Sequence, residues 1–141
     1  MVSVSVVMPV FNNVGSIEKS VQEVVHHLTN VLKVTPEVVL IEDGSTDDSW
    51  KICGELTASY PEVVRAVRLS RNFGQVNALS AGFSRASGDA VVAMSADLQD
   101  PIELMTEMVT AWKSGTDVVI AHRASRHDDV MSRVFSRLAY K

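Results

Sequence analysis

Short, uniformly apolar runs alternate along this chain with longer segments in which apolar residues recur every three or four positions. The short runs lack a regular polar alternation, which is typical of strands buried on both faces. These predicted strands cover residues 3–10, 37–41, 63–69, 89–94 and 117–121. The longer segments predict amphipathic helices at about 16–33, 48–60, 75–86 and 101–113, with a further helix beginning within 131–141.

The regular alternation of strand and helix predicts the fold class. Strands that are separated by a helix pair in parallel, and the connecting helices then lie on both faces of the sheet. Crossovers of this kind are right-handed. We therefore predict an α/β fold with a mostly parallel sheet and helices on both faces.

Composition limits the classes of protein that fit this pattern. The 141 residues make one domain or part of one, and 46% hydrophobic with 21% charged residues is ordinary for a globular core. A net charge of −4 argues against a nucleic-acid partner, whose binding surface is usually basic. No apolar run reaches the roughly 18 residues of a membrane span. The single Cys53 excludes an internal disulfide and suits the cytoplasm.

Polar residues collect after the predicted strands. The segments that follow the strands are 9–13, 42–47, 71–75, 95–100 and 122–126. The carboxyl ends of parallel strands lie at one edge of the sheet, where open α/β folds bind ligands. We therefore predict a binding site built from five loops that are far apart in the chain.

The fourth of these segments offers oxygen ligands between a strand and a helix. Asp97 and Gln99 come first, and Asp100, Pro101 and Glu103 then form a helix-start pattern with Asp100 as N-cap. Capping explains Asp100 but not Asp97. Mg²⁺ or Mn²⁺ bound to a diphosphate needs only one or two protein ligands. Asp97 and Gln99 are thus predicted to lie at a metal site.

The common phosphate-binding motifs are missing. There is neither a G-x-G-x-x-G after the first strand nor a G-x-x-x-x-G-K-[ST], so phosphates would need a metal instead. Asp43 is placed to accept hydrogen bonds from a base or ribose, although Asp43 and Asp47 also suit a tight turn. Arg71 and Arg123, at strand ends, are either phosphate partners or solvated charges.

Four motifs in order carry a resemblance to a known family. They are Val-Val-Met-Pro-Val-Phe-Asn-Asn at 6–13, Ile-Glu-Asp-Gly-Ser-Thr-Asp at 41–47, Arg-Asn-Phe-Gly-Gln at 71–75 with Ala-Gly-Phe at 81–83, and Ser-Ala-Asp-Leu-Gln-Asp-Pro at 95–101. The sequence resembles the inverting glycosyltransferases of family 2, which have the Rossmann-like GT-A nucleotide-diphospho-sugar transferase fold. Among them it looks like the polyprenyl-phosphate glycosyltransferases. The resemblance covers nearly the whole chain.

The resemblance implies roles for individual residues. It gives a nucleotide-binding role to Pro9, Phe11, Asn13, Asp43, Arg71, Gly74 and Asp97. It gives the metal-binding role, for Mg²⁺ or Mn²⁺, to Asp97 and Gln99, and contacts with donor or acceptor phosphates to Arg123 and Arg126. No residue is identified as the catalytic base.

The resemblance also implies a reaction. A sugar passes from a nucleotide-diphosphate-sugar to an acceptor, here a polyprenyl phosphate, with a divalent metal and inversion at the anomeric carbon. Residues 1–141 would be the N-terminal nucleotide-sugar-binding part of a truncated GT-A domain, without its acceptor-side region. The full-length protein is expected at the cytoplasmic face of the membrane. The sequence leaves the oligomeric state open between a monomer and a homo-oligomer.

One departure from the family pattern keeps two alternatives open. Ser95 stands where that pattern has an aspartate. If the aspartate is needed, the chain is a catalytically impaired relative that binds nucleotide. The second alternative is a non-enzymatic binding module on a flavodoxin-like sheet, whose acidic strand ends also hold Mg²⁺. Metal-dependent nucleotide binding distinguishes the enzyme from this module.

Overall fold

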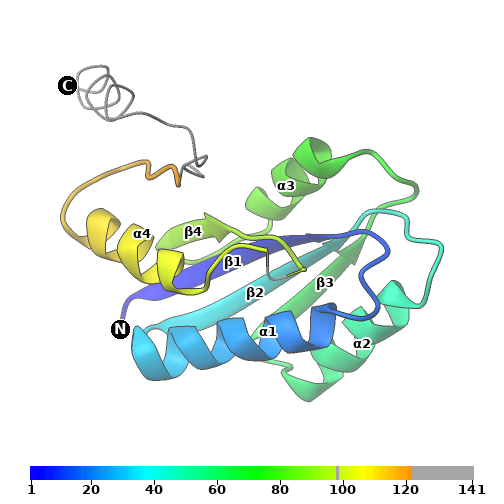
Figure 1. Cartoon of the computed structure of the whole chain (residues 1–141), viewed down its shortest axis with the longest axis horizontal. Coiled ribbons are helices and arrows are strands. Elements are labelled where there is room, and N and C mark those ends of the chain that lie inside the picture. The colour runs from blue at the N-terminus through cyan, green and yellow to red at the C-terminus, as the bar shows by residue number, and fades with distance from the viewer. Residues whose placement is uncertain (98, 122–141) are drawn as a thin grey trace.

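A four-stranded parallel sheet forms the centre of the computed structural model, which describes residues 1–97 and 99–121 (Figure 1). Its strands, in the spatial order β3-β2-β1-β4, are β1 (Ser3–Val10), β2 (Thr35–Glu42), β3 (Val64–Arg68) and β4 (Ala90–Ala93). All three neighbouring pairs run parallel. The predicted parallel sheet is therefore confirmed.

The helices alternate with the strands. They are α1 (Ile17–His26), continued by a π-helical turn η1 (His27–Val31), then α2 (Ser49–Ser59), α3 (Gln75–Phe83) and α4 (Glu103–Lys113). Within the described residues, none of them is both long enough and apolar enough to cross a membrane.

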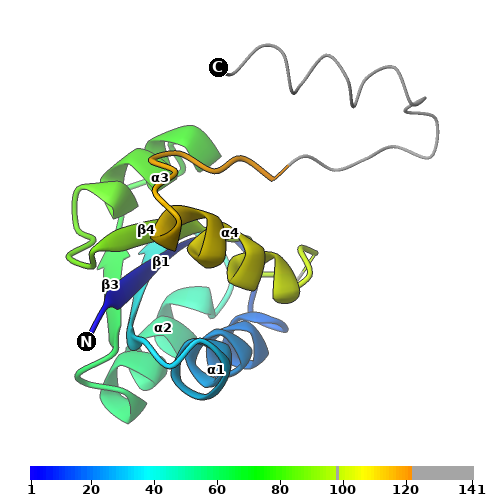
Figure 2. The same ribbon diagram turned by 90° about the vertical axis from the view of Figure 1, so that its left-hand side faces the viewer.

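Helices cover both faces of the sheet, as predicted (Figure 2). One face packs on α1, α2 and α4, and the core there includes Met8 of β1 and Met105 of α4. The other face packs on α3, where Val7 and Ala78 belong to a second, smaller core. Gly82 lets α3 approach β1 closely, because a Cβ at this position would overlap Val7 Cγ1.

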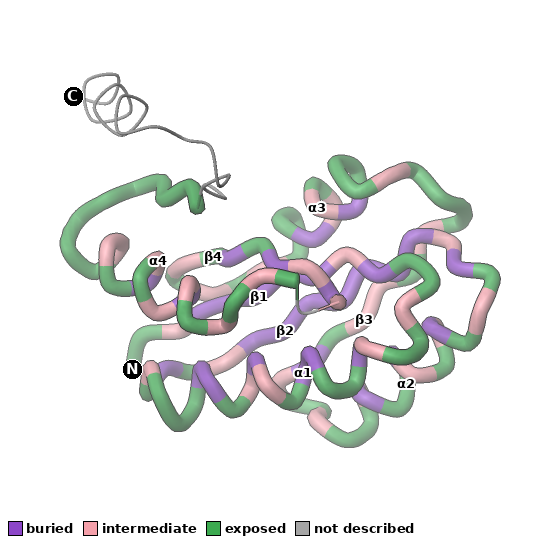
Figure 3. Tube along the Cα trace, viewed as in Figure 1, coloured by how far each residue is buried: buried purple, intermediate pink, exposed green. Residues whose placement is uncertain are grey.

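The two central strands are buried along almost their whole length (Figure 3). Val4, Val6 and Val7 of β1 have no exposed surface, and neither have Leu40 and Ile41 of β2. Strands buried on both faces have no solvent-facing polar side, which is why apolar residues dominate both sequences.

The predicted fifth strand at 117–121 is wrong. In the described part of the chain this segment pairs with no strand, and Val118 and Ile120 are 74% and 73% exposed. A strand needs a backbone partner as well as an apolar sequence. β4 is an edge of the described sheet, and residues 117–121 do not pair with it.

In two of the predicted helices the α-helical part ends before the predicted last residue. The helix expected at 16–33 is α-helical only to His26, continues as η1, and is followed by Lys33 in a left-handed conformation (φ 52°). Apolar spacing does not distinguish one π-helical turn from an α-helical one. The helix expected at 75–86 ends at Phe83 and gives way to a turn.

The start of α4 also differs from the prediction. The helix begins at Glu103 with Ile102 at the N-cap position, so the prediction of Asp100 as N-cap and Pro101 as first helical residue is wrong. The Pro101 carbonyl accepts a hydrogen bond from the N–H three residues on (3.1 Å). This proline therefore belongs to a tight turn that precedes the helix.

At the amino end of the sheet a buried carboxylate, Glu37, connects three segments. It is 9% exposed, and it accepts hydrogen bonds from the hydroxyls of Ser5 and Ser87 and from the Ser87 backbone N–H. The Arg65 guanidinium lies 3.5 Å away. Burial by itself raises the pKa of Glu37, but these donors and the guanidinium outweigh it and hold the pKa below its usual 4.5.

We expect acid to destabilise the protein through Glu37. A lowered folded-state pKa stabilises the fold above the unfolded-state pKa, and this contribution is lost as the pH falls below 4.5 through the folded-state value. Urea denaturation between pH 7 and pH 3 measures the effect. The free energy of unfolding should decrease more steeply in the wild type than in Glu37→Gln, and equal slopes would contradict this role.

Candidate functional site

The loops after β1 and β2 are joined by hydrogen bonds at the carboxyl edge of the sheet. The Asn12 N–H donates to Ser45 Oγ (3.0 Å), and the Asn12 side-chain oxygen accepts from the Thr46 N–H (2.9 Å). The Asn13 N–H donates to Ser49 Oγ (2.9 Å). Asn12 has φ 53°, a left-handed conformation that asparagine adopts more readily than most residues.

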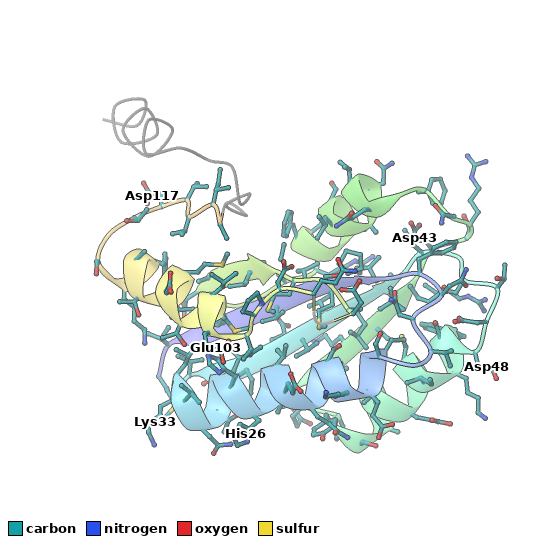
Figure 4. All side chains as sticks on the ribbon, viewed as in Figure 1. His26, Lys33, Asp43, Asp48, Glu103 and Asp117 are labelled. Carbon is teal, nitrogen blue, oxygen red and sulfur yellow. The ribbon has the colours of Figure 1, made fainter. Side chains whose placement is uncertain are left out.

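Asp43 joins these two loops to the loop after β3, and Figure 4 shows it at this edge of the sheet, far from Lys33 at the opposite end. Its side chain is nearly buried. One carboxylate oxygen accepts the Phe73 N–H (2.7 Å) and the other accepts the Gly74 N–H (2.9 Å). Asp43 thus fixes the loop at 71–74, a role that neither of the sequence interpretations of this residue includes.

The acidic loop after β4 is attached to the start of α1. The Ala96 carbonyl accepts a hydrogen bond from Ser16 Oγ (2.9 Å), and Ser20 Oγ lies 2.8 Å from the same oxygen. Ser20 has no exposed surface. This attachment was not predicted. Its signal in the sequence is a polar residue, Ser20, on the apolar face of a helix.

Removing both hydroxyls would leave the Ala96 carbonyl without these donors. We expect the double variant Ser16→Ala/Ser20→Ala to lose roughly 1–3 kcal/mol of stability and to bind metal and nucleotide more weakly, because Asp97 is the next residue. Urea denaturation and calorimetry measure the two effects. Ser59→Ala is the control, because the Ser59 hydroxyl donates to the Glu55 carbonyl at an exposed position of α2. We expect its free energy of unfolding to change by no more than about 0.5 kcal/mol. A double variant that matches this control would contradict the attachment.

Asp97 receives two hydrogen bonds on one of its oxygens. Ser95 Oγ donates to Asp97 Oδ1 (2.5 Å), and the Gln99 N–H reaches the same atom (3.2 Å). No donor from residues 1–97 or 99–121 reaches Oδ2. The half-buried Asp97 therefore keeps one oxygen available to a ligand.

These loops surround one hollow of about 320 Å³ at the carboxyl edge. It is lined by Pro9, Phe11, Asn13, Asp43, Asn72, Gly74, Gln75, Ser95 and Asp97. Six of the seven residues predicted to bind nucleotide are in this lining, although they come from four different loops. Asn72, Gln75 and Ser95 are further lining residues to which no role was assigned from the sequence.

Four of the predicted site residues are not among the lining residues. Arg71 is exposed, and its guanidinium lies 4.9 Å from the centre of the Phe73 ring. Gln99 is exposed, and its backbone N–H donates to Asp97 Oδ1 (3.2 Å). Arg123 and Arg126, with the fifth predicted loop, lie outside the described residues.

A second, larger hollow of about 580 Å³ lies between β4, α4 and residues 117–121. Its lining is mostly apolar and includes Met105, Val109 and Trp112. It borders β4, which is an edge of the described sheet, and contains none of the predicted nucleotide-binding residues. The chemistry-bearing residues belong to the smaller hollow.

The side chains around the smaller hollow suit a cation that brings its own phosphate ligands. Asp97 offers a carboxylate oxygen, and hard oxygen donors are what Mg²⁺ and Mn²⁺ prefer. The described residues contain no group of three His, Cys, Asp or Glu side chains that could hold a metal ion by themselves. The residues therefore fit a metal–diphosphate complex rather than a cation enclosed by protein.

Comparison with known proteins decides the family. Residues 5–139 match the model of glycosyl transferase family 2. The chain belongs to this family. A relative, the bactoprenol glucosyl transferase of Shigella phage SfV, is 40% identical over 129 residues, 89% of this chain and 40% of its own length. An undecaprenyl-phosphate 4-deoxy-4-formamido-L-arabinose transferase of Proteus mirabilis is 36% identical over 96% of this chain and 41% of its own.

Solved structures confirm the GT-A fold of this family 2 chain. A mannosyltransferase of Pyrobaculum calidifontis, in complex with GDP-Man and Mn²⁺, superposes with a TM-score of 0.63 at 24% identity, over 75% of this chain and 31% of its own. A glucosyl-3-phosphoglycerate synthase of Mycobacterium tuberculosis, with Mn²⁺ and UDP, gives 0.56 at 28% identity, over 79% and 39%. The chain thus spans about 40% of the length of the two relatives named above.

Proposed function

We propose that this protein binds a nucleotide-diphosphate-sugar with Mg²⁺ or Mn²⁺ and transfers the sugar to a polyprenyl phosphate with inversion. Residues 1–141 would be the donor-binding part of the enzyme. The observation that carries the proposal is that Asp43 and Asp97 line the same hollow at the carboxyl edge of the sheet in a family 2 chain. The names of the two relatives, which specify bactoprenol and undecaprenyl phosphate, support a lipid-phosphate acceptor. Transfer to such an acceptor would take place at the cytoplasmic face of the membrane.

The lining residues suggest how the donor lies. Phe11 is 45% exposed at the hollow and offers an aromatic face to a base. Asp43 borders the same space, and its oxygens have lone pairs left for a base or ribose donor. Gly74 is the N-cap residue of α3 and Gln75 its first residue, so the positive end of that helix lies beside the hollow and favours a diphosphate.

The opposite side of the hollow carries the acidic loop. Asp97 would hold the cation, and Arg123 and Arg126 remain predicted contacts for phosphates. A bound divalent cation would neutralise the charge that develops on the departing nucleoside diphosphate.

The proposed reaction places few demands on a general base. A phosphate oxygen of the acceptor forms a bond to the anomeric carbon while the bond from that carbon to the diphosphate breaks on the opposite side. The acceptor phosphate is already ionised near neutral pH, so no proton has to leave it during attack. The task of the donor-binding part is then to hold and orient the diphosphate-sugar.

Calorimetry with UDP and GDP, with and without Mn²⁺, tests the proposal, and circular dichroism verifies that the protein is folded. We expect binding of one nucleotide only when Mn²⁺ is present. Transfer of labelled sugar to undecaprenyl phosphate is then measured with the full-length protein. Binding without transfer would mean that the protein is a nucleotide-binding relative of these enzymes without their activity. If folded protein shows no metal-dependent nucleotide binding, the proposed glycosyltransferase function is wrong.

A further inference from the structure

Two donors, one of them the Ser95 hydroxyl, hold Asp97 by the same carboxylate oxygen. The Ser95 hydroxyl donates to Oδ1 at 2.5 Å, and the Gln99 N–H approaches the same atom at 3.2 Å. Both donors therefore hold one side of a carboxylate that would otherwise rotate. The other oxygen, Oδ2, has no donor among the described residues. Ser95 and Asp97 both line the hollow, so this orientation bears directly on a ligand there.

The hollow carries little negative charge for a site that takes up a dication. Its lining contains two acidic residues, Asp43 and Asp97. Both oxygens of Asp43 already accept backbone N–H groups from the loop after β3. One carboxylate with one available oxygen is too few ligands to hold Mg²⁺ or Mn²⁺, which are usually completed in such sites by waters and substrate phosphates.

We infer that Ser95 is a positioning residue for Asp97 and that the hollow takes its divalent cation together with a nucleoside diphosphate, not before it. This inference rests on the proposed function and adds to it an order of loading and a role for Ser95. The phosphate oxygens supply the ligands that the lining lacks. A carboxylate at position 95 would lie against Asp97, and a cation would relieve the repulsion between the two.

Electron paramagnetic resonance of Mn²⁺ tests the inference on the full chain, because the signal of the free ion is lost on binding. Titrations are run without nucleotide, with UDP and with GDP, and protein-free titrations give the metal bound by nucleotide alone. For the wild type we expect nucleotide to tighten Mn²⁺ binding roughly tenfold to a hundredfold.

Three substitutions at position 95 separate the hydroxyl from the charge. Ser95→Ala should weaken binding of the metal–nucleotide complex about tenfold, which is typical of losing a group that orients a metal ligand. Ser95→Thr keeps the hydroxyl and should stay within about twofold of the wild type. Ser95→Asp should bind Mn²⁺ without nucleotide. Ser80→Ala, exposed on α3 away from the hollow, is the matched control and should equal the wild type.

Each contrary result overturns a defined part of the inference. A wild type that binds Mn²⁺ equally well without nucleotide, or a Ser95→Asp variant that still needs nucleotide, overturns the order of loading. A folded Ser95→Ala variant that equals the wild type, or a Ser95→Thr variant that equals Ser95→Ala, overturns the positioning role. Absence of any metal–nucleotide complex with folded wild type overturns the proposed function itself, so the two failures are distinguishable.

Discussion

Replacing Asp97 with asparagine is expected to abolish metal-dependent nucleotide binding. The amide keeps the volume of the side chain, and its oxygen still accepts the Ser95 hydroxyl, so the loop keeps its shape. The variant loses the negative charge and the available carboxylate oxygen. We expect the affinity for UDP or GDP in the presence of Mn²⁺ to fall by at least about a hundredfold. Sugar transfer should fall with it, because the leaving diphosphate is no longer neutralised.

Calorimetry with and without Mn²⁺ measures this loss. Asp48→Asn is the matched control, because it removes the same charge from the loop after β2, where Asp48 is exposed and lies outside the hollow. We expect this control to bind like the wild type. If Asp97→Asn keeps the metal-dependent affinity of the wild type, the cation is held elsewhere and the proposed site is wrong.

The regular elements could be predicted where the apolar pattern of a segment decides its own burial. β1 was predicted to the residue, because both of its faces are buried and its sequence is mostly apolar. Residues 117–121 have a similar pattern but form no strand in the described part, because pairing depends on a partner elsewhere in the chain. The choice between Asp100 and Ile102 at the start of α4 is equally non-local, since it depends on how the preceding loop packs.

The candidate site was predictable to the extent that topology determines it. Parallel strands bring their carboxyl ends to one edge, and this alone places Asp43 and Asp97 around one hollow. The hydrogen bonds that hold the loops were not predictable in the same way. Ser16 and Ser20 bond to a backbone carbonyl that lies far away in the sequence, and no residue pattern specifies such a partner. Ser95 was noticed as a departure from the family pattern, and its bond to Asp97 gives that departure a physical role.

Gly44→Ala is expected to destabilise the protein and to disturb the hollow at the same time. Gly44 has φ 70°, which alanine adopts only at a cost. A Cβ at this position would also lie 2.5 Å from the backbone carbonyl carbon of Arg71 and the backbone nitrogen of Asn72. Backbone atoms cannot move aside as a flexible side chain can, so the loop after β3 must shift. We expect a loss of roughly 2–4 kcal/mol in the free energy of unfolding.

The displaced loop is the one that Asp43 holds, so nucleotide binding should weaken even in the fraction that remains folded. Urea denaturation measures the stability, and calorimetry at low temperature measures the binding. Gly15→Ala is the control, because a Cβ there meets nothing within 4 Å. Gly44→Asn separates the two causes, since asparagine tolerates the left-handed conformation but still carries a Cβ. We expect asparagine to be no better than alanine, because overlap with the loop is the larger effect. A Gly44→Asn protein with wild-type stability and binding would show that the close approach of the two loops is not required.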